Sequence, residues 1–234
     1  MLLSIRHILC LFAAAVASAS LTVEKEKGDV ACRRIMAERR VINAPIRFGP
    51  RRKALTLEYL RRHADPNAND IQILPRVIVL HWTACATIEE ARRCFDQEEL
   101  PAARADIRGG GRVNVSAHYL VDRDGTVYRL MPDGWMARHV IGLNHCAIGI
   151  ENVGGPAWPL TEAQVEANAW LAVRLMRAYP TIAHVIGHHE YLQFKGTPLW
   201  RQRDPSYRAY RKIDPGDAFV NAVRARIARC ADQG

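Results

Sequence analysis

A continuous run of apolar, mostly β-branched residues occupies positions 76–82 (RVIVLHW), directly after Pro75. An apolar run of this length beside a proline is typical of a strand that is buried on both faces. Such a strand needs other elements packed above and below it. The run therefore predicts the centre of a sheet that is covered by helices.

Other strands and helices alternate with this run along the chain. Further strands are predicted at 147–153 and 182–186, and a hairpin is predicted at 117–130 around Asp124 and Gly125. Helices are predicted at 87–95, from Thr161 to the residue before Pro180, and after Pro215. This alternation, without an internal repeat, predicts a single α/β domain with a central mixed β-sheet flanked by helices.

Composition excludes a disordered chain, because 49% of the residues are hydrophobic and 24% are charged. The net charge of +9 favours an anionic partner: nucleic acid, an acidic membrane or a carboxylate-rich polymer. The excess lies at residues 33–62, which hold ten Lys or Arg residues against Glu38 and Glu58. We interpret this segment either as a solvated basic face or as an electrostatic contact with an anionic cell envelope. No motif indicates nucleic-acid binding.

The first nineteen residues have the layout of a secretory signal peptide. Arg6 precedes an apolar run at 8–17, and Ala17-Ser-Ala19 fits a cleavage site before Ser20. We therefore expect export to the periplasm or the extracellular space and no transmembrane segment in the mature chain. The predicted organisation is a signal peptide (1–19), a basic N-terminal extension (20–72) and a catalytic domain (73–234).

Export would place the mature cysteines in an oxidising compartment. Two pairings are hypotheses: Cys85 with Cys94, which are the closest pair in sequence, and Cys32 with Cys230, which lie near the two mature termini. Cys146 would then be a free thiol.

Ionisable residues stand at the ends of the predicted strands. His81 closes the first apolar run, His188 follows the run at 182–186, and Glu151 ends the run at 147–150. Two imidazoles at strand ends are candidate zinc ligands, although each histidine is also compatible with an ordinary structural role. A third ligand is needed. Asp214 and Asp204, each followed by proline, are alternatives, and Asp214 is also a candidate helix cap.

Five motifs in order are more specific than any single residue. They are VIVLHWT at 77–83, VSAHYLVDRDG at 115–125, Asn144 followed by IGIEN at 148–152, Gly187-His188, and RKIDPG at 211–216. Over residues 73–228 the chain resembles the zinc-dependent N-acetylmuramoyl-L-alanine amidases, a family that includes AmpD-type amidases, phage lysozymes and peptidoglycan recognition proteins. The resemblance implies a mixed sheet with a zinc groove on one side, and hydrolysis of the amide bond between N-acetylmuramic acid and L-alanine in peptidoglycan or muropeptides.

The resemblance also implies roles for individual residues. The zinc ligands would be His81, His188 and Asp214, with Glu151 as general base and Lys212 as the residue that stabilises the oxyanion. His188 is chosen over His189 because the family ligand directly follows the glycine. Neighbouring residues of an extended strand face opposite sides, so only one of the two should face the metal.

Three more motif positions, His118, His139 and Asn144, would line the groove and bind substrate or support the metal ligands. The chain departs from some relatives in having Ala117 where they carry a tyrosine, so catalysis should rely on the glutamate. Residues 191–210 form an insertion that we expect to contribute to the groove wall.

Two other functions remain compatible with these motifs. One is a peptidoglycan-binding module without catalysis, and the other is a zinc peptidase that acts on the stem peptide. The sequence does not decide between intact peptidoglycan and soluble or anhydro-muropeptides as substrate.

Overall fold

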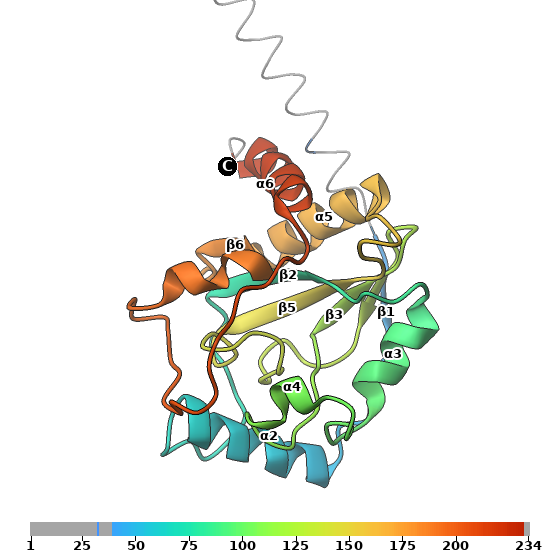
Figure 1. Cartoon of the computed structure of the whole chain (residues 1–234). Coiled ribbons are helices and arrows are strands. Elements are labelled where there is room, and N and C mark those ends of the chain that lie inside the picture. Colours follow the sequence, from blue (N-terminus) through green and yellow to red (C-terminus); the bar gives the residue numbers. More distant parts are fainter. Residues whose placement is uncertain (1–31, 33–38, 232–234) are drawn as a thin grey trace, which may run out of the picture.

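The computed structural model describes residue 32 and residues 39–231 (Figure 1). The predicted signal peptide and most of residues 20–38 lie outside this range. Within the described part, no helix has the length and apolar character that crossing a membrane requires.

Six strands form one sheet in the order β1-β4-β3-β5-β2-β6. The β3–β4 pair is antiparallel and every other pair is parallel, which confirms the predicted mixed sheet. The strands are β1 (Val41–Asn43), β2 (Val77–Trp82), β3 (Tyr119–Val121), β4 (Val127–Arg129), β5 (Ala147–Asn152) and β6 (His184–Gly187).

Helices cover both faces of the sheet (Figure 1). α5 and α6 pack together on one face and enclose a core with the inner strands, and α2 lies on the other face. The helices are α2 (Pro50–His63), α3 (Ile88–Asp96), α4 (Ala105–Arg108), α5 (Glu162–Ala178) and α6 (Asp217–Ala231), with a 3-10 helix η1 (His188–Phe194).

Local sequence signals account for several element boundaries. The Thr161 side chain accepts from the backbone N–H of Gln164, whose side chain in turn accepts from the N–H of Thr161, so α5 begins with the predicted capping box. The β3–β4 hairpin turns at Gly125, whose φ of +85° is a backbone conformation that favours glycine.

The pleat of β2 and β5 determines where the ionisable strand-end residues point. His81 pairs in register with Glu151 on the neighbouring parallel strand. Leu80 and Ile150 pack into the core on the α5–α6 side. Because side chains alternate along a strand, His81 and Glu151 face the opposite side, at the C-terminal edge of the sheet.

Much of the predicted basic extension packs on this fold. β1 pairs with β4, and α2 contributes Leu55, Tyr59 and Leu60 to the core on its side of the sheet. Arg52 is fully buried and donates to the carbonyl oxygens of Phe95 and Gln97 at 2.7 and 2.9 Å.

Several arginines of this region form ion pairs with acidic residues of later elements. The pairs are Arg47–Asp96, Arg51–Glu99 and Arg62–Asp204, at 2.8, 2.7 and 2.6 Å. Part of the excess positive charge is therefore balanced within the fold.

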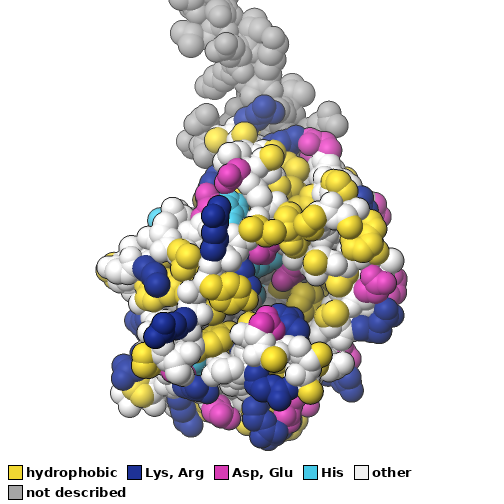
Figure 2. Space-filling model, in the orientation of Figure 1, with side chains coloured by type: hydrophobic (Ala, Val, Ile, Leu, Met, Phe, Trp, Pro, Cys, Tyr) yellow, Lys and Arg dark blue, Asp and Glu magenta, His cyan; other side chains and the backbone are white. Residues whose placement is uncertain are grey.

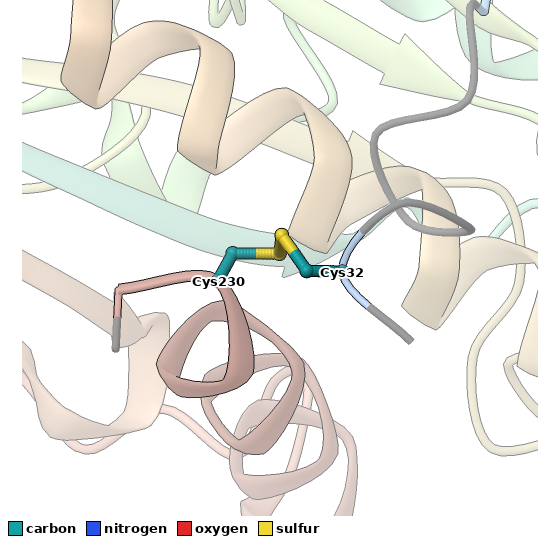
Figure 3. The surroundings of a disulfide bond; sticks show 2 residues. All are labelled: Cys32 and Cys230. Atoms are coloured by element: carbon teal, nitrogen blue, oxygen red, sulfur yellow. A yellow bond between two sulfur atoms is a disulfide. The ribbon is translucent and has the colours of Figure 1, made fainter. Parts of the chain in front are cut away.

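One of the two predicted disulfides is present. Cys32 is bonded to Cys230 in the last turn of α6, with the Cα atoms 5.0 Å apart (Figure 3). The predicted Cys85–Cys94 bond is wrong for this structure, because within the described residues both are free thiols, as is Cys146. Cys85 directs its Sγ toward the carbonyl oxygen of Thr83 at 3.5 Å and also interacts with the side chain of Cys94, which is exposed on α3.

Candidate active site

Three donor atoms from distant parts of the chain meet at the C-terminal edge of the sheet. His81 Nδ1 lies 3.1 Å from His188 Nδ1 and 3.2 Å from Asp214 Oδ2, and the last two atoms are 3.1 Å apart. All three residues are buried or nearly so. The atoms form an almost equilateral triangle.

This triangle fits a zinc ion in both chemistry and size. Nitrogen and oxygen donors bind zinc at about 2.0–2.1 Å, and a tetrahedral arrangement at that distance separates two donors by about 3.3 Å. Two histidines and one carboxylate also leave a fourth position open, as catalytic zinc sites require.

A 3-10 helix, and not a strand, determines which of the two neighbouring histidines faces the triangle of donor atoms. His188 and His189 open η1 instead of continuing β6, so the turn of a 3-10 helix separates their side chains. His188 joins the triangle, whereas His189 turns to Asp217 at 2.8 Å. The predicted residue is the one that faces the site, but strand alternation is not the reason.

The structure also separates the two candidate aspartates. Asp214 meets both histidines, whereas Asp204 lies in a loop where it bonds Ser206 and Arg62. Burial would raise the pKa of Asp214, but the close contacts of its Oδ2 atom with His188 and His81 hold that pKa below its ordinary value. Burial lowers the pKa of His188 to about 4, so its lone pair is available at neutral pH.

Glu151 is a buried carboxyl group beside this triangle. The residue is 9% exposed, and its Oε2 atom has no hydrogen-bond partner among the described residues. Burial raises the pKa of Glu151 to about 7; the neighbouring His81 opposes this shift and the charge of Asp214 adds to it. A carboxyl group with this pKa can both accept and return a proton near neutral pH.

Lys212 lies on the wall of the same cavity, two residues before Asp214. Its Nζ atom donates to the Tyr210 hydroxyl at 2.6 Å and lies 4.1 Å from the centre of that ring. Tyr210 belongs to the insertion, and the buried Tyr191 holds its backbone through hydrogen bonds of 2.6 and 2.9 Å.

His139 contacts the Nε2 atom of His81, the ring nitrogen that is not part of the triangle. Its Nδ1 lies 3.0 Å from His81 Nε2, and its own Nε2 lies 3.3 Å from the carbonyl oxygen of Ala147. This order fixes the tautomers: Nε2–H of His139 donates to the carbonyl, Nδ1 accepts from Nε2–H of His81, and His81 Nδ1 is left free. Burial keeps the pKa of His139 well below its ordinary value, which keeps this acceptor neutral.

His118 and Asn144 have different surroundings. His118 is fully buried outside the cavity lining, and its ring bonds the backbone at Gly149 and Trp135, at 3.0 and 2.8 Å. Asn144 does line the cavity, but its oxygen accepts from the N–H groups of His139 and Val140, at 2.9 and 2.7 Å. Both residues hold the backbone around His139.

The predicted site residues other than His118 line a cavity of about 390 Å³, visible in Figure 2 as a hollow with histidine and acidic side chains inside it. The lining also includes residues that were not predicted as site residues, among them Trp82, Tyr59 of α2, Arg104 before α4, and Arg138. Trp82 and Arg138 directly follow and precede motif histidines, which was an available signal. Nothing local in the sequence points to Tyr59 or Arg104.

A mixed sheet whose strand ends bring together two histidines, an aspartate and a buried glutamate has the chemistry of a metal-assisted hydrolase. The sequence profile of the N-acetylmuramoyl-L-alanine amidase family matches residues 69–217. The chain belongs to this family, and it is therefore an amide hydrolase of peptidoglycan.

Solved structures of low sequence identity share the fold. The N-acetylmuramoyl-L-alanine amidase LysC from Clostridium intestinale is 19% identical over 82% of this chain and 99% of its own, with a TM-score of 0.51. The Staphylococcus aureus hydrolase AmiA, solved with its ligand, is 13% identical over 88% and 91% of the two chains, also with a TM-score of 0.51. No curated protein matches the sequence significantly.

Proposed function

We propose that the protein is a zinc-dependent N-acetylmuramoyl-L-alanine amidase that holds its metal with His81, His188 and Asp214. The observation that carries this proposal is the triangle of donor atoms 3.1–3.2 Å apart, beside a buried glutamate of raised pKa. When bound, zinc is a Lewis acid that polarises a carbonyl oxygen and makes a water molecule more acidic.

The protein's own groups then move the proton and stabilise charge. Glu151 takes the proton of the attacking water and returns it to the departing nitrogen of L-alanine, for which a pKa near 7 is well suited. The ammonium group of Lys212 faces the cavity and stabilises the oxyanion that develops on the lactyl carbonyl. His139 orients His81, while His118 and Asn144 hold the segment that carries His139.

Product analysis tests this proposal. Purified protein is assayed for zinc and incubated with intact sacculi and with isolated muropeptides, with and without a chelator. We expect one zinc per chain and cleavage between N-acetylmuramic acid and L-alanine that stops on chelation and returns with zinc. Cleavage within the stem peptide would indicate a peptidase, and binding without cleavage would indicate a binding module.

We also propose that residues 1–19 are a signal peptide and that the catalytic residues of 73–234 act in the periplasm or outside the cell. The Cys32–Cys230 disulfide supports this location, because such bonds persist in oxidising compartments. N-terminal sequencing of the exported protein should find Ser20 first. The envelope contact through residues 33–62 stays a prediction, and weaker sacculus binding at higher salt would support it.

A further inference from the structure

Lys212 needs a fixed position if its charge is to stabilise an oxyanion. A lysine ammonium group stands on a flexible four-carbon stem, so it is preorganised only when other groups hold it. Asp214, two residues further on, directs its carboxylate at His81 and His188 instead. Among the residues that the structure describes, the one hydrogen-bond partner of the Lys212 side chain is the hydroxyl of Tyr210. Tyr210 is therefore the candidate for the group that fixes the lysine.

The contact with Tyr210 leaves the charge of the lysine available. Lys212 Nζ lies 2.6 Å from the Tyr210 hydroxyl oxygen and 4.1 Å from the centre of its ring, within reach of a cation–π interaction. A carboxylate would also hold an ammonium group, but its negative charge would oppose the stabilisation of an anion, whereas a neutral phenol has no such effect. An ammonium group has three N–H donors, so one hydroxyl leaves two for other acceptors. Both side chains line the catalytic cavity.

A buried residue next to the metal site fixes the backbone of Tyr210. Tyr191 is fully buried, and its hydroxyl donates to the carbonyl oxygen of Tyr210 at 2.6 Å and accepts from the N–H of Tyr210 at 2.9 Å. Tyr191 belongs to η1, and the centre of its ring lies 5.1 Å from that of His188 in the same helix. The group that holds the lysine and one of the candidate metal ligands are therefore supported by the same buried side chain.

The insertion at 191–210 is also fixed at its far end. In Figure 1 it runs from η1 to α2 and returns toward α6. At α2, the N–H of Arg203 donates to the carbonyl oxygen of His63 at 2.9 Å. On the way back, the buried Tyr207 accepts from Arg138 at 3.2 Å. Since the insertion is attached at several points, a side chain that it carries has a defined position at the cavity.

From these contacts we propose that Tyr210 is a positioning residue, which holds the ammonium group of Lys212 at the cavity where the oxyanion develops. The inference rests on the proposed amidase function. Tyr210 acts through the lysine: its hydroxyl and its ring restrict the flexible side chain before substrate binds, so that the charge is already in place in the transition state. The insertion then has a second role besides forming part of the groove wall, because it carries the group that fixes Lys212.

The kinetic test compares two variants of the tyrosine. Tyr210→Phe keeps the ring and removes the hydroxyl, whereas Tyr210→Ala removes both. We expect kcat on a muropeptide to fall about threefold in the first variant and about tenfold in the second, with zinc content unchanged. KM should stay within about twofold of wild type, because the lysine acts on the transition state. The matched control is Arg211→Ala, an exposed residue between Tyr210 and Lys212, which should keep the kcat of wild type.

A double-mutant cycle separates positioning from an independent role of Tyr210. Lys212→Met should reduce kcat by about 10²-fold, because it removes the charge that stabilises the oxyanion. If the tyrosine acts only through the lysine, Tyr210→Ala should cost less than about twofold in the Lys212→Met background. A tenfold loss in both backgrounds would overturn the inference. So would a Tyr210→Ala variant with the kcat of wild type, or an equal loss of kcat in Arg211→Ala.

A second measurement does not depend on the cleavage of an amide. The chain contains five lysines, so NMR of protein labelled with ¹³C-lysine gives the order parameter of each ε-carbon, and Lys212→Met assigns the Lys212 signal. Lys212 should be more rigid than the exposed Lys195 in wild type and as mobile as Lys195 in Tyr210→Ala. Equal order parameters for the two lysines in wild type would overturn the inference. A rigid Lys212 in a protein that cleaves no amide would support the placement of the lysine and overturn the proposed function alone.

Discussion

Two clusters of histidine and carboxylate side chains lie side by side in this protein and differ in the groups that their polar atoms contact. In the first, His81, His188 and Asp214 direct their donor atoms at one another. In the second, Glu190 is held by both terminal nitrogens of Arg224 at 2.7 and 3.0 Å, and His189 bonds outward to carboxylate and backbone.

Residue types alone do not separate these clusters, since each offers histidine and carboxylate donors within 4.8 Å of one another. The first cluster is buried and converges on one point, so a cation satisfies all its donors together. The second already has a cation, the guanidinium of Arg224, and fastens η1 to α6. We therefore interpret the first as a metal site and the second as a structural link.

The largest expected difference comes from replacing the two neighbouring histidines. His188→Ala should lose zinc and at least about 10³-fold of the activity, because it removes a metal ligand. His189→Ala should keep zinc and lose less than tenfold of the activity. Metal analysis and kcat/KM of both variants check this, and equal losses in the two would contradict the assignment of the clusters.

Glu151→Ala should separate metal binding from turnover. We expect full zinc content with kcat reduced by about 10²–10⁴-fold, because the variant lacks the group that accepts the proton. The acidic limb of the pH–rate profile should disappear with it. Normal cleavage of muropeptides by this variant would overturn the role of Glu151.

The raised pKa of Glu151 also predicts a pH-dependent cost in stability. The folded metal-free protein holds the proton to about pH 7, whereas the carboxyl of the unfolded chain ionises near its ordinary value of 4.5. The unfolded state thus binds fewer protons between these values, and the free energy of unfolding falls as the pH rises through this window, by up to about 3 kcal/mol.

Glu151→Gln should remove this loss, so the variant should gain stability over wild type at pH 8 but not at pH 4. Urea unfolding of both chelated proteins at the two pH values checks the sign. A constant difference between the two proteins would show that Glu151 ionises normally.

His139→Ala tests the group behind the metal site. Because His139 accepts from His81 Nε2–H, its loss should weaken zinc affinity by about 10–100-fold with the ligands intact. Competition with a chelator of known affinity measures this. The matched control is His145→Ala, a half-buried histidine outside the triangle, for which zinc affinity should not change.

The smallest effect is expected in the second cluster. Glu190→Gln removes the charge that faces Arg224 and should reduce the free energy of unfolding by about 1 kcal/mol, since this pair is partly exposed. Zinc content and kcat should stay within about twofold of wild type. Loss of zinc in this variant would instead assign the second cluster to the metal site.

Sequence predicted most of the elements that carry the site. The apolar runs before His81 and before Glu151 form strands as predicted, because the alternation of side chains in a strand is encoded by adjacent residues. In the structure these two strands are neighbours in register. The capping box of α5 is local in the same way. Family resemblance, rather than pattern, selected Asp214 and Lys212.

Sequence missed what depends on contacts between distant segments. The pairing of Cys85 with Cys94 followed from proximity along the chain, but the two side chains, although in contact, remain free thiols in the fold. Tyr59 lies in the predicted extension, yet it lines the cavity because α2 packs across the sheet.

The order of residues along the chain thus specifies a mixed α/β sheet with a histidine and a glutamate at two strand ends. The fold added what the sequence did not indicate: Tyr59 of α2 and Arg104 before α4 line the catalytic cavity, and Cys85 and Cys94 remain free thiols. Strand alternation and helix caps arise from interactions between residues that are close in the chain. Convergence of side chains depends instead on how helices and loops far apart in the sequence pack against the sheet.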